Sequence, residues 1–430
     1  MRIRRSLLLC LLLALVASGA AVAVARQRSP VPPPGPEPLG AAGQLCADAL
    51  GRFANTLYRE LADDASGGNL VVSPWSVWSS MASFATFCDG ASRDEVVRAL
   101  GFEGEGVTDE TLRAGRAELL ERMRRADRYV TLDASQAVWI ERSLEIDSEA
   151  ARSLRRESGV DLERVDFRNR GESASRDIAA WIRSAAGGGG PARARAFPPL
   201  TDLVLTDALS LRARWRDPFD ARRTAPGEFQ RLDGAAVPVP MMSHNLMHGV
   251  DGKENPRFAA VRLFEDDERA AATAVELPHR GERTSLILVL PDLADGLFDV
   301  ESRLDVARLG AALDAAEPRE IKVVVPRLSI RRSIDLQPAL RAMGVESIFE
   351  SVDLSRLFAG PASGRHVGSV SQGAALDVDE HGVRSWAFTE WHIFDAVPDV
   401  VTADHPFLVI VRERTSGAVL FVGRVLDPST

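Results

Sequence analysis

The chain has 430 residues, of which 45% are hydrophobic and 26% charged, a balance typical of a globular protein with enough apolar material for a large core. The formal net charge is -9, so no overall positive field favours binding to nucleic acid or to anionic lipid. Length alone suggests two or three domains.

The N-terminus has the layout of a secretory signal peptide. A basic start precedes an apolar run, and small residues stand in Ala-x-Ala spacing at Ala21, Ala23 and Ala25. We therefore expect residues 1–25 to be removed and the protein to be exported, to the cell exterior or to a periplasm. The apolar run is long enough to act as a membrane anchor if it is retained, which is the one membrane association expected.

Residues 26–41 are rich in proline and predict a disordered tether, followed by a folded domain over residues 42–430. Residues 42–64 repeat apolar side chains at four-residue spacing, which indicates a helix. Ser73 as a cap and a proline in the first turn begin a second predicted helix, over residues 73–102.

Farther along the chain the predicted elements change from helices to strands. The patterns predict helices at residues 109–130 and 173–186 and strands at residues 132–140, 202–211, 284–291, 320–328, 374–380, 406–413 and 418–426. Helices early and strands late indicate an α+β fold with mixed or antiparallel sheets. No proline-, glycine- or charge-rich stretch after residue 41 is long enough to separate two cores, so we expect one domain.

Few residues offer enzyme or metal chemistry. The sequence has no Gly-x-Ser-x-Gly, His-Glu-x-x-His, Cys-x-x-Cys or phosphate-binding loop, so neither an enzyme nor a cofactor is expected. His244 and His248 are four apart, but their neighbourhood reads as strand and turn, which does not suit a metal site. Two cysteines follow the leader, Cys46 and Cys88, and we expect both to be buried free thiols.

Six arginines cluster in the third predicted helix: Arg113, Arg116, Arg122, Arg124, Arg125 and Arg128. They could form a stripe that binds a polyanion. Because Glu118 and Glu121 interrupt the stripe, a solvated helix face with intrahelical ion pairs is the better interpretation.

The segment DEHGVRSWAFTEWHIFDAVPDVVTADHPF, residues 379–407, has neither a helical nor a strand period over about two dozen residues. In a compact domain a structureless loop of this size is uncommon, and it is usually either functional or disordered. Predicted strands flank it on both sides. Whether this segment is a functional loop or a disordered one decides the predicted function.

Several segments together resemble the serpins, from about Leu45 to Pro428. NLVVSPWSVWSSMASFATFCDGASRDEVVRALGF is similar to the family's second helix and the segment after that helix. LVLTDALSLRARWRDPFD is similar to the strand that ends in Lys-Gly-Lys-Trp-x-x-Pro-Phe, with Trp215, Pro218 and Phe219 in place. VTADHPFLVIVRERTSGAVLFVGRVLDP is similar to the C-terminal signature.

The resemblance implies one domain of about eight to nine helices and three β-sheets, with an exposed reactive-centre loop in the unassigned segment. In the family's mechanism a serine protease attacks the loop and forms an acyl-enzyme. The cut loop then inserts into the main sheet and distorts the protease. The resemblance thus implies an exported monomeric inhibitor without catalytic groups, acting on a serine protease or a cysteine protease.

An inserting strand needs small residues on its core-facing side, and alternate residues share a side. The resemblance implies a hinge beginning at Glu380 and Gly382, where the glycine lets the backbone turn. Its inward residues would be Val383, Ser385, Ala387 and Thr389, all small or modest. Its outward residues include Arg384, Trp386 and Phe388, which are bulkier than the family's usual residues and favour a second hypothesis, a non-inhibitory binding or structural protein.

The bond that the protease would cut has three candidates. Counting forward from Gly382 by the family's hinge length indicates Ala396-Val397, which suits an elastase-like or subtilisin-like protease. Counting back from Pro406 indicates Asp395-Ala396. Phe394 would suit a chymotrypsin-like protease. Ala396 is preferred.

The resemblance also implies a polar cluster that controls opening of the main sheet. Ser73 and Ser76 match the family's serines, whereas Asp207 replaces an asparagine and Gln372 a histidine. We expect the carboxylate to accept hydrogen bonds from the glutamine amide and two hydroxyls. Trp215 is assigned to the same sheet-opening region. A hydrolase built on Ser73 is the remaining alternative, but a helix cap explains this serine better.

Overall fold

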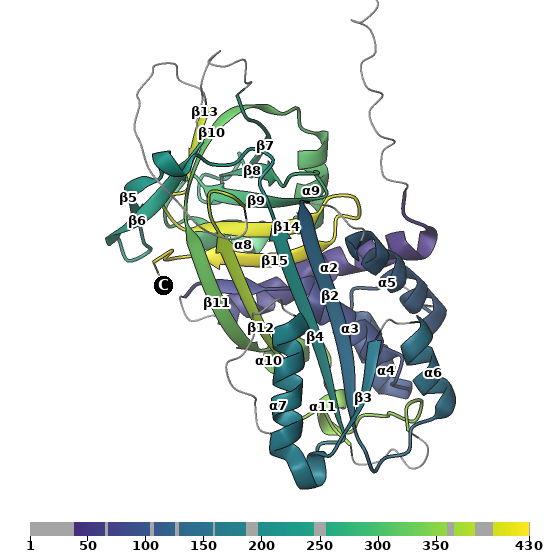
Figure 1. Ribbon diagram of the computed structural model, residues 1–430. Helices are drawn as coiled ribbons and strands as arrows, with labels where there is room; N and C mark the ends of the chain where they lie inside the picture. The colour runs from purple at the N-terminus through teal and green to yellow at the C-terminus, as the bar shows by residue number, and fades with distance from the viewer. Residues whose placement is uncertain are drawn as a thin grey trace, which may run out of the picture. The chain divides into compact units, whose positions relative to one another are not determined.

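The computed structural model describes residues 38–64, 68–103, 107–124, 129–157, 160–185, 197–244, 255–358, 365–382 and 399–429. Leu39–Thr430 form one compact unit. Within the described part, ten α-helices and three β-sheets make an α+β fold (Figure 1), which confirms the predicted fold class and exceeds the expected helix number by one. The leader and nearly all of the tether lie outside the described residues.

A three-stranded sheet carries the candidate site. Its order is β3 (Val160–Val165), β2 (Val130–Glu141) and β4 (Leu203–Ala213), with β2 parallel to β3 and antiparallel to β4. The pairing of Gln136 with Asp207 places even positions of β2 opposite odd positions of β4. These positions share one face of the sheet.

Helices cover both faces of this sheet (Figure 1). On one face, Ala137 and Trp139 pack against Phe167 and Ile178 of α7 (Phe167–Ala185). The alternate residues of β2, including Val138, belong to the main core on the side of α3 (Pro74–Ala85) and α5 (Asp109–Arg124). The odd positions of β4, Asp207 among them, therefore face α3 and α5.

A two-stranded antiparallel sheet pairs β11 (Leu328–Asp335) with β12 (Ser371–Val378). Among the described strands, β12 pairs with β11 alone and β4 with β2 alone. Each therefore keeps one edge that no described strand covers.

The third sheet has ten strands and supplies much of the core. In spatial order they are β1 (Leu70–Val72), β15 (Val419–Val425), β14 (Phe407–Glu413), β9 (Thr284–Pro291), β8 (Ala272–Pro278), β7 (Arg257–Leu263), β10 (Arg319–Pro326), β6 (Ala236–Ser243) and β5 (Ala225–Gln230), while β13 (Asp399–Thr402) pairs in parallel with β10. β9, β14 and β15 are buried along their whole length, which explains why each contains an apolar run of four or more residues rather than an alternating pattern. The strand predicted at residues 284–291 is confirmed.

The remaining helices complete the unit. They are α2 (Ala41–Asp64), α4 (Gly90–Ala99), α6 (Ser148–Glu157), α8 (Leu297–Arg303), α9 (Val306–Ala315), α10 (Gln337–Ala342) and α11 (Ser347–Glu350), with a short 3₁₀ helix, η1, at Ala221–Arg223. In the described part of the chain, no helix is both long and apolar enough to cross a membrane. Cys46 and Cys88 are buried free thiols, as expected.

The single helix predicted over residues 73–102 is wrong, because the chain breaks it after Ala85. The Thr86 hydroxyl donates to the Ser83 carbonyl at 2.7 Å and helps to end α3. Gly90 then takes a positive φ of 55°, a conformation that glycine adopts easily, and α4 begins. The helix predicted over residues 109–130 ends at Arg124, and Val130 already belongs to β2.

Candidate functional site

The predicted hinge begins in a tight turn that closes at Gly382. Asp379 N–H donates to Gly382 O at 2.9 Å, and Gly382 N–H donates to Asp379 O at 3.3 Å. Gly382 has φ +145°, and a Cβ built on it would lie 2.1 Å from the carbonyl oxygen of Ala213. The close approach of β4 therefore requires glycine at this position. The strand predicted at residues 374–380 ends at Val378, so Glu380 lies in the turn.

Glu380, within this turn, is completely buried. Its Oε1 accepts two hydrogen bonds from Arg327, from Nε at 2.8 Å and from Nη2 at 2.6 Å, and another from the Thr224 hydroxyl. Burial alone would raise the pKa of this carboxyl, but the donors outweigh burial and the pKa lies below its ordinary value. Glu380 is thus held as a carboxylate.

Trp215 packs beneath the turn, at the end of β4. Its indole Nε1–H donates to the Asp379 carbonyl at 2.7 Å and its backbone N–H to the His381 carbonyl at 3.1 Å. The ring stacks on His279 with centroids 4.9 Å apart. Burial lowers the pKa of His279 to about 3, so this imidazole is neutral.

Gly382 also forms an antiparallel bridge with Arg214, the residue that follows β4. Arg214 N–H meanwhile donates to Tyr129 O on the β2 side. The turn therefore delivers the chain to the uncovered edge of β4. The predicted inward hinge residues Val383, Ser385, Ala387 and Thr389 and the candidate cleavage residues Phe394, Asp395, Ala396 and Val397 lie outside the described residues.

A polar cluster surrounds the N-terminus of α3. Gln372 on β12 makes two hydrogen bonds to the backbone of Ser73: its Oε1 accepts from Ser73 N–H at 2.8 Å, and its Nε2 donates to Ser73 O at 3.0 Å. The Ser73 hydroxyl accepts from Ser76 N–H at 3.3 Å and caps the helix. The Ser76 hydroxyl in turn donates to Asp207 on β4.

These hydrogen bonds differ from the expected pattern. Asp207 accepts from the Ser76 hydroxyl, whereas the Gln372 amide serves the Ser73 backbone instead of the carboxylate. The N-terminus of α3 thus binds both strands. It contacts β12 through the backbone of Ser73 and β4 through the hydroxyl of Ser76. Trp215 lies with the hinge turn rather than with this cluster, since the eight positions from Asp207 to Trp215 correspond to about 26 Å of strand.

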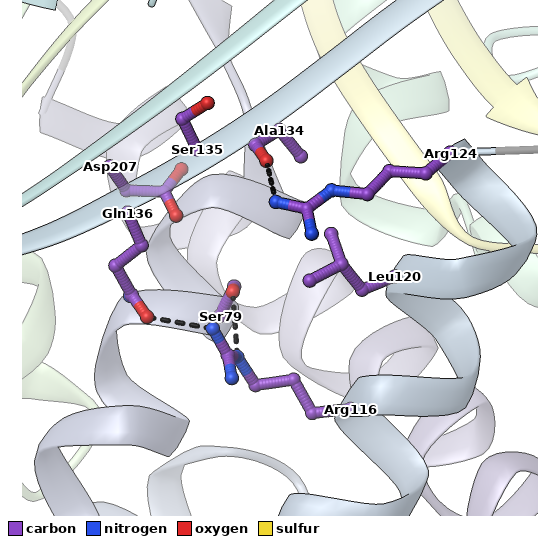
Figure 2. A pocket seen from close by; sticks show the side chains of 8 residues that line it. All are labelled: Ser79, Arg116, Leu120, Arg124, Ala134, Ser135, Gln136 and Asp207. Atoms are coloured by element: carbon purple, nitrogen blue, oxygen red, sulfur yellow. Dashed lines mark hydrogen bonds between the residues drawn. The ribbon is translucent and has the colours of Figure 1, made fainter. Parts of the chain in front are cut away.

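A small cavity of about 10 Å³ adjoins Asp207 between the sheet and the helices (Figure 2). It has room for about one water molecule. Its lining includes Arg116 and Arg124 of α5, together with Ser79 and Gln136. Loss of hydration raises the pKa of Asp207 to about 7, although the Ser76 hydrogen bond and the Arg116 charge both oppose this shift.

Arg116 is the residue that sequence reasoning placed wrongly. The interpretation of its helix face as solvated fails here, because only 3% of Arg116 is exposed. Its Nε donates to Ser79 Oγ at 3.1 Å and its Nη2 to Gln136 Oε1 at 2.7 Å (Figure 2). Burial lowers its pKa to about 10, so the side chain stays charged at neutral pH.

Other arginines of α5 agree in part with the predicted solvated helix face. Arg122 forms the expected intrahelical ion pair with Glu118, at 3.7 Å. Arg124 donates to the Ala134 carbonyl at 2.5 Å, while Arg125 and Arg128 lie outside the described residues. Helical spacing could have found the buried position of Arg116, because Leu112, Arg116 and Leu120 are four residues apart and share the buried face of the helix.

No group of three or more metal-ligating side chains occurs in the described segments. His244 lies at the end of β6, stacked on Phe219 with centroids 3.9 Å apart, and burial lowers its pKa to about 4. His248 lies outside the described residues.

Residues 48–428 match the family described as Serpin (serine protease inhibitor). Among curated proteins, serpin A3-2 of Bos taurus is 27% identical over 389 residues, which cover 90% of each chain. Putative serpin-Z5 of Oryza sativa subsp. japonica is 30% identical, covering 86% of this chain and 87% of that protein. Leukocyte elastase inhibitor of Bos taurus is 27% identical, covering 88% and 98%.

Solved structures agree on the fold. Human thyroxine-binding globulin, crystallised with its hormone, superposes with a TM-score of 0.78 at 20% identity, covering 90% of this chain and all of that one. Uncleaved ovalbumin superposes with a TM-score of 0.75 at 21% identity, with the same coverage. At these identities the structures bear on the fold alone.

Proposed function

Because this chain belongs to the serpin family, which it matches over residues 48–428, we propose that it is an exported inhibitor that traps a serine protease as a covalent acyl-enzyme. The target would cut the loop that follows Gly382, at a bond near Ala396, and the cut loop would then enter the sheet beside β4. A cysteine protease is a further possible target. The relatives include an inhibitor of leukocyte elastase, which supports the general activity.

The observation that carries the proposal is the edge of β4 that no described strand covers, with Gly382 bridged to Arg214 just past the end of this strand. An antiparallel strand continuing from the pair Gly382–Arg214 would put Val383 opposite Ala213 and Thr389 opposite Asp207. Opposite residues share a face of a sheet, and the odd positions of β4 face the core. The bridge therefore supports the inward set Val383, Ser385, Ala387 and Thr389 independently of any resemblance.

The same register gives the bulky hinge residues a definite environment. Trp386 and Phe388 would lie opposite Ser210 and Ala208, on the face that α7 covers. Trp391 would follow Thr389 in the inward set and is larger than the residues before it. Insertion would therefore be easy at the hinge and harder farther along the strand.

The energy available from insertion is large enough to drive the mechanism. β4 offers eleven positions, and a strand that pairs with both β4 and β12 would form about ten backbone hydrogen bonds. At about 1 kcal/mol net for each bond, they would contribute on the order of 10 kcal/mol. This is comparable with the whole stability of an ordinary domain.

The preferred cleavage site is Ala396-Val397, which suits an elastase-like or subtilisin-like protease with a small specificity pocket. Asp395-Ala396 and a bond after Phe394 remain the alternatives. Export would bring the inhibitor to proteases outside the cytoplasm.

A non-inhibitory binding or structural protein is the second candidate function. The bulky residues Arg384, Trp386 and Phe388 favour it. In this case the loop would be cut without trapping the protease.

Incubation of the mature protein with elastase, subtilisin, chymotrypsin and trypsin separates the two functions. Inhibition predicts a complex that survives denaturing electrophoresis, and the size of the released C-terminal fragment identifies the cut bond. Cleavage with no stable complex at any enzyme ratio would support the second candidate. The control is Val383→Glu, which places a charge in the inward set and should convert the inhibitor into a plain substrate; complex formation unchanged by it would contradict the insertion mechanism.

A further inference from the structure

Two arginines lie next to each other at the end of β4 without an acidic partner. Arg214 follows the strand, and Arg280 lies in the turn between β8 and β9. The backbone N–H of Arg280 donates to the Arg214 carbonyl at 2.6 Å, and both side chains are exposed. Neither side chain forms a hydrogen bond or an ion pair with a residue that the structure describes. Their positive charges are therefore not balanced within this part of the chain.

Tyr129 places the two side chains on one face of the sheet. The Arg214 N–H donates to the Tyr129 carbonyl at 3.4 Å, which continues the pairing of Val130 with Ala213 by one residue. Residues opposite each other in an antiparallel pair share a face of the sheet. The guanidinium of Arg280 lies over the Tyr129 ring, 4.4 Å from its centroid. Both guanidinium groups are thus held on the same side of the sheet.

The carboxylates nearest in the sequence have other partners. Glu282, two residues after Arg280, accepts hydrogen bonds from Arg216 at 3.2 Å and from Arg414 at 3.5 Å. Asp217 accepts from Arg216 at 2.7 Å. Both carboxylates are therefore bound by arginines that do not belong to the pair.

Arg212 adds a third positive charge to this face. It lies two positions before Arg214, opposite Thr131 of β2, and its side chain is exposed. Alternate residues of a strand share a side, so Arg212 and Arg214 face the same way. Asp133 lies diagonally across from Arg212 in the strand pairing and balances one charge. The charges of Arg214 and Arg280 remain.

We propose that Arg214 and Arg280 form a binding site for a phosphate group, carried by the free anion or by a phosphate monoester on a larger molecule. A guanidinium donates two parallel N–H bonds to such an oxyanion, which gives both arginines a shared acceptor. A phosphate monoester carries a charge of about −1.5 to −2 at neutral pH, which matches two positive charges. A carboxylate would balance only one of them. The site is independent of the proposed protease inhibition.

Isothermal titration calorimetry of the protein with inorganic phosphate tests the proposal, at low ionic strength so that screening is small. Phenyl phosphate is the second probe, because it carries the same group as an ester, and acetate is the monoanionic control. Arg214→Gln and Arg280→Gln each remove one charge from an exposed position. Arg308→Gln on α9 is the matched control, since this arginine is also exposed but pairs with Asp305 at 3.5 Å.

We expect one phosphate to bind per chain, about tenfold more weakly in Arg214→Gln and in Arg280→Gln, because each variant removes charge-assisted hydrogen bonds. Binding should be unchanged in Arg308→Gln. Binding of phenyl phosphate as well would identify a phosphorylated molecule as the ligand, and binding of inorganic phosphate alone would identify the free anion. No binding at millimolar phosphate, equally tight binding of acetate, or binding that neither Arg214→Gln nor Arg280→Gln weakens would overturn the proposal.

Discussion

At the residue scale, Gly382 is where the local backbone and the candidate function meet. Its positive φ closes the turn, and its missing side chain lets the chain contact the backbone of β4 at Ala213. Just past the end of β4, the Trp215 indole also holds the turn by donating to the Asp379 carbonyl at 2.7 Å. The first residues of the hinge are therefore held in one position against the end of β4.

We predict that Gly382→Ala destabilises the protein by about 2 kcal/mol or more, because it combines a strained φ with a Cβ that would contact the Ala213 carbonyl. Thermal unfolding of the intact protein measures the loss. Gly373→Ala on β12 is the matched control, since a Cβ there meets nothing within 4 Å. Equal effects of the two substitutions would show that the close approach at Gly382 is not real.

The polar partners of a buried charge were the feature least visible in the sequence. The arginine-rich pattern of α5 predicted a solvated face, and Arg122 follows it, whereas Arg116 does not. Its partners Ser79 and Gln136 lie on other elements, 37 and 20 residues away. Periodicity reports which face of a helix is apolar, but it does not report which polar groups a different element brings to that face.

At the element scale, sequence patterns predicted strands best where burial is uniform. β9 agrees with its predicted range because both its faces are buried and its apolar run is continuous. The break between α3 and α4 was missed, although α3 is small and apolar and almost wholly buried, whereas α4 carries the charged run Arg93, Asp94 and Glu95. The ending depends on Thr86 and on the positive φ of Gly90.

The polar cluster, too, could be predicted only in part. The residue types Ser73, Ser76, Asp207 and Gln372 could be selected from the sequence, and the structure brings all four to the N-terminus of α3. Which atoms pair could not be predicted, because Gln372 uses the backbone of Ser73 rather than the Asp207 carboxylate. That choice makes the helix terminus a shared anchor of β4 and β12.

We predict that Gln372→Leu lowers stability by about 1 to 3 kcal/mol, because it leaves the buried N–H and C=O of Ser73 without the two hydrogen bonds that Gln372 makes. It should also detach β12 from α3 and speed loop insertion after nicking. Thermal unfolding and the time course of the melting-temperature gain measure the two effects. Ser371→Ala, an exposed neighbour on the same strand, is the control, and a Gln372→Leu protein that behaves like it would remove the anchor role.

At the scale of the whole molecule, the three-stranded and the two-stranded sheet each keep one edge that no described strand covers. β4 and β12 contact a common helix terminus, and the bridge from Arg214 to Gly382 closes the end of β4. One added strand would make a continuous six-stranded sheet from the three-stranded and two-stranded ones. The sequence predicted the strands but not this division, since strand pairing depends on contacts between distant segments.

We predict that nicking the loop raises the melting temperature by roughly 10 °C or more. A gain of about 10 kcal/mol in hydrogen bonding, divided by an unfolding entropy of about 0.8 kcal/mol/K for a domain of this length, gives this magnitude. Differential scanning calorimetry of intact and nicked protein measures it, at pH 8 so that Asp207 is ionised. Nicked Val383→Glu protein should gain much less, because a charge would have to be buried opposite Ala213. If the nicked and the intact protein had the same melting temperature, insertion of the loop between β4 and β12 would not stabilise the fold.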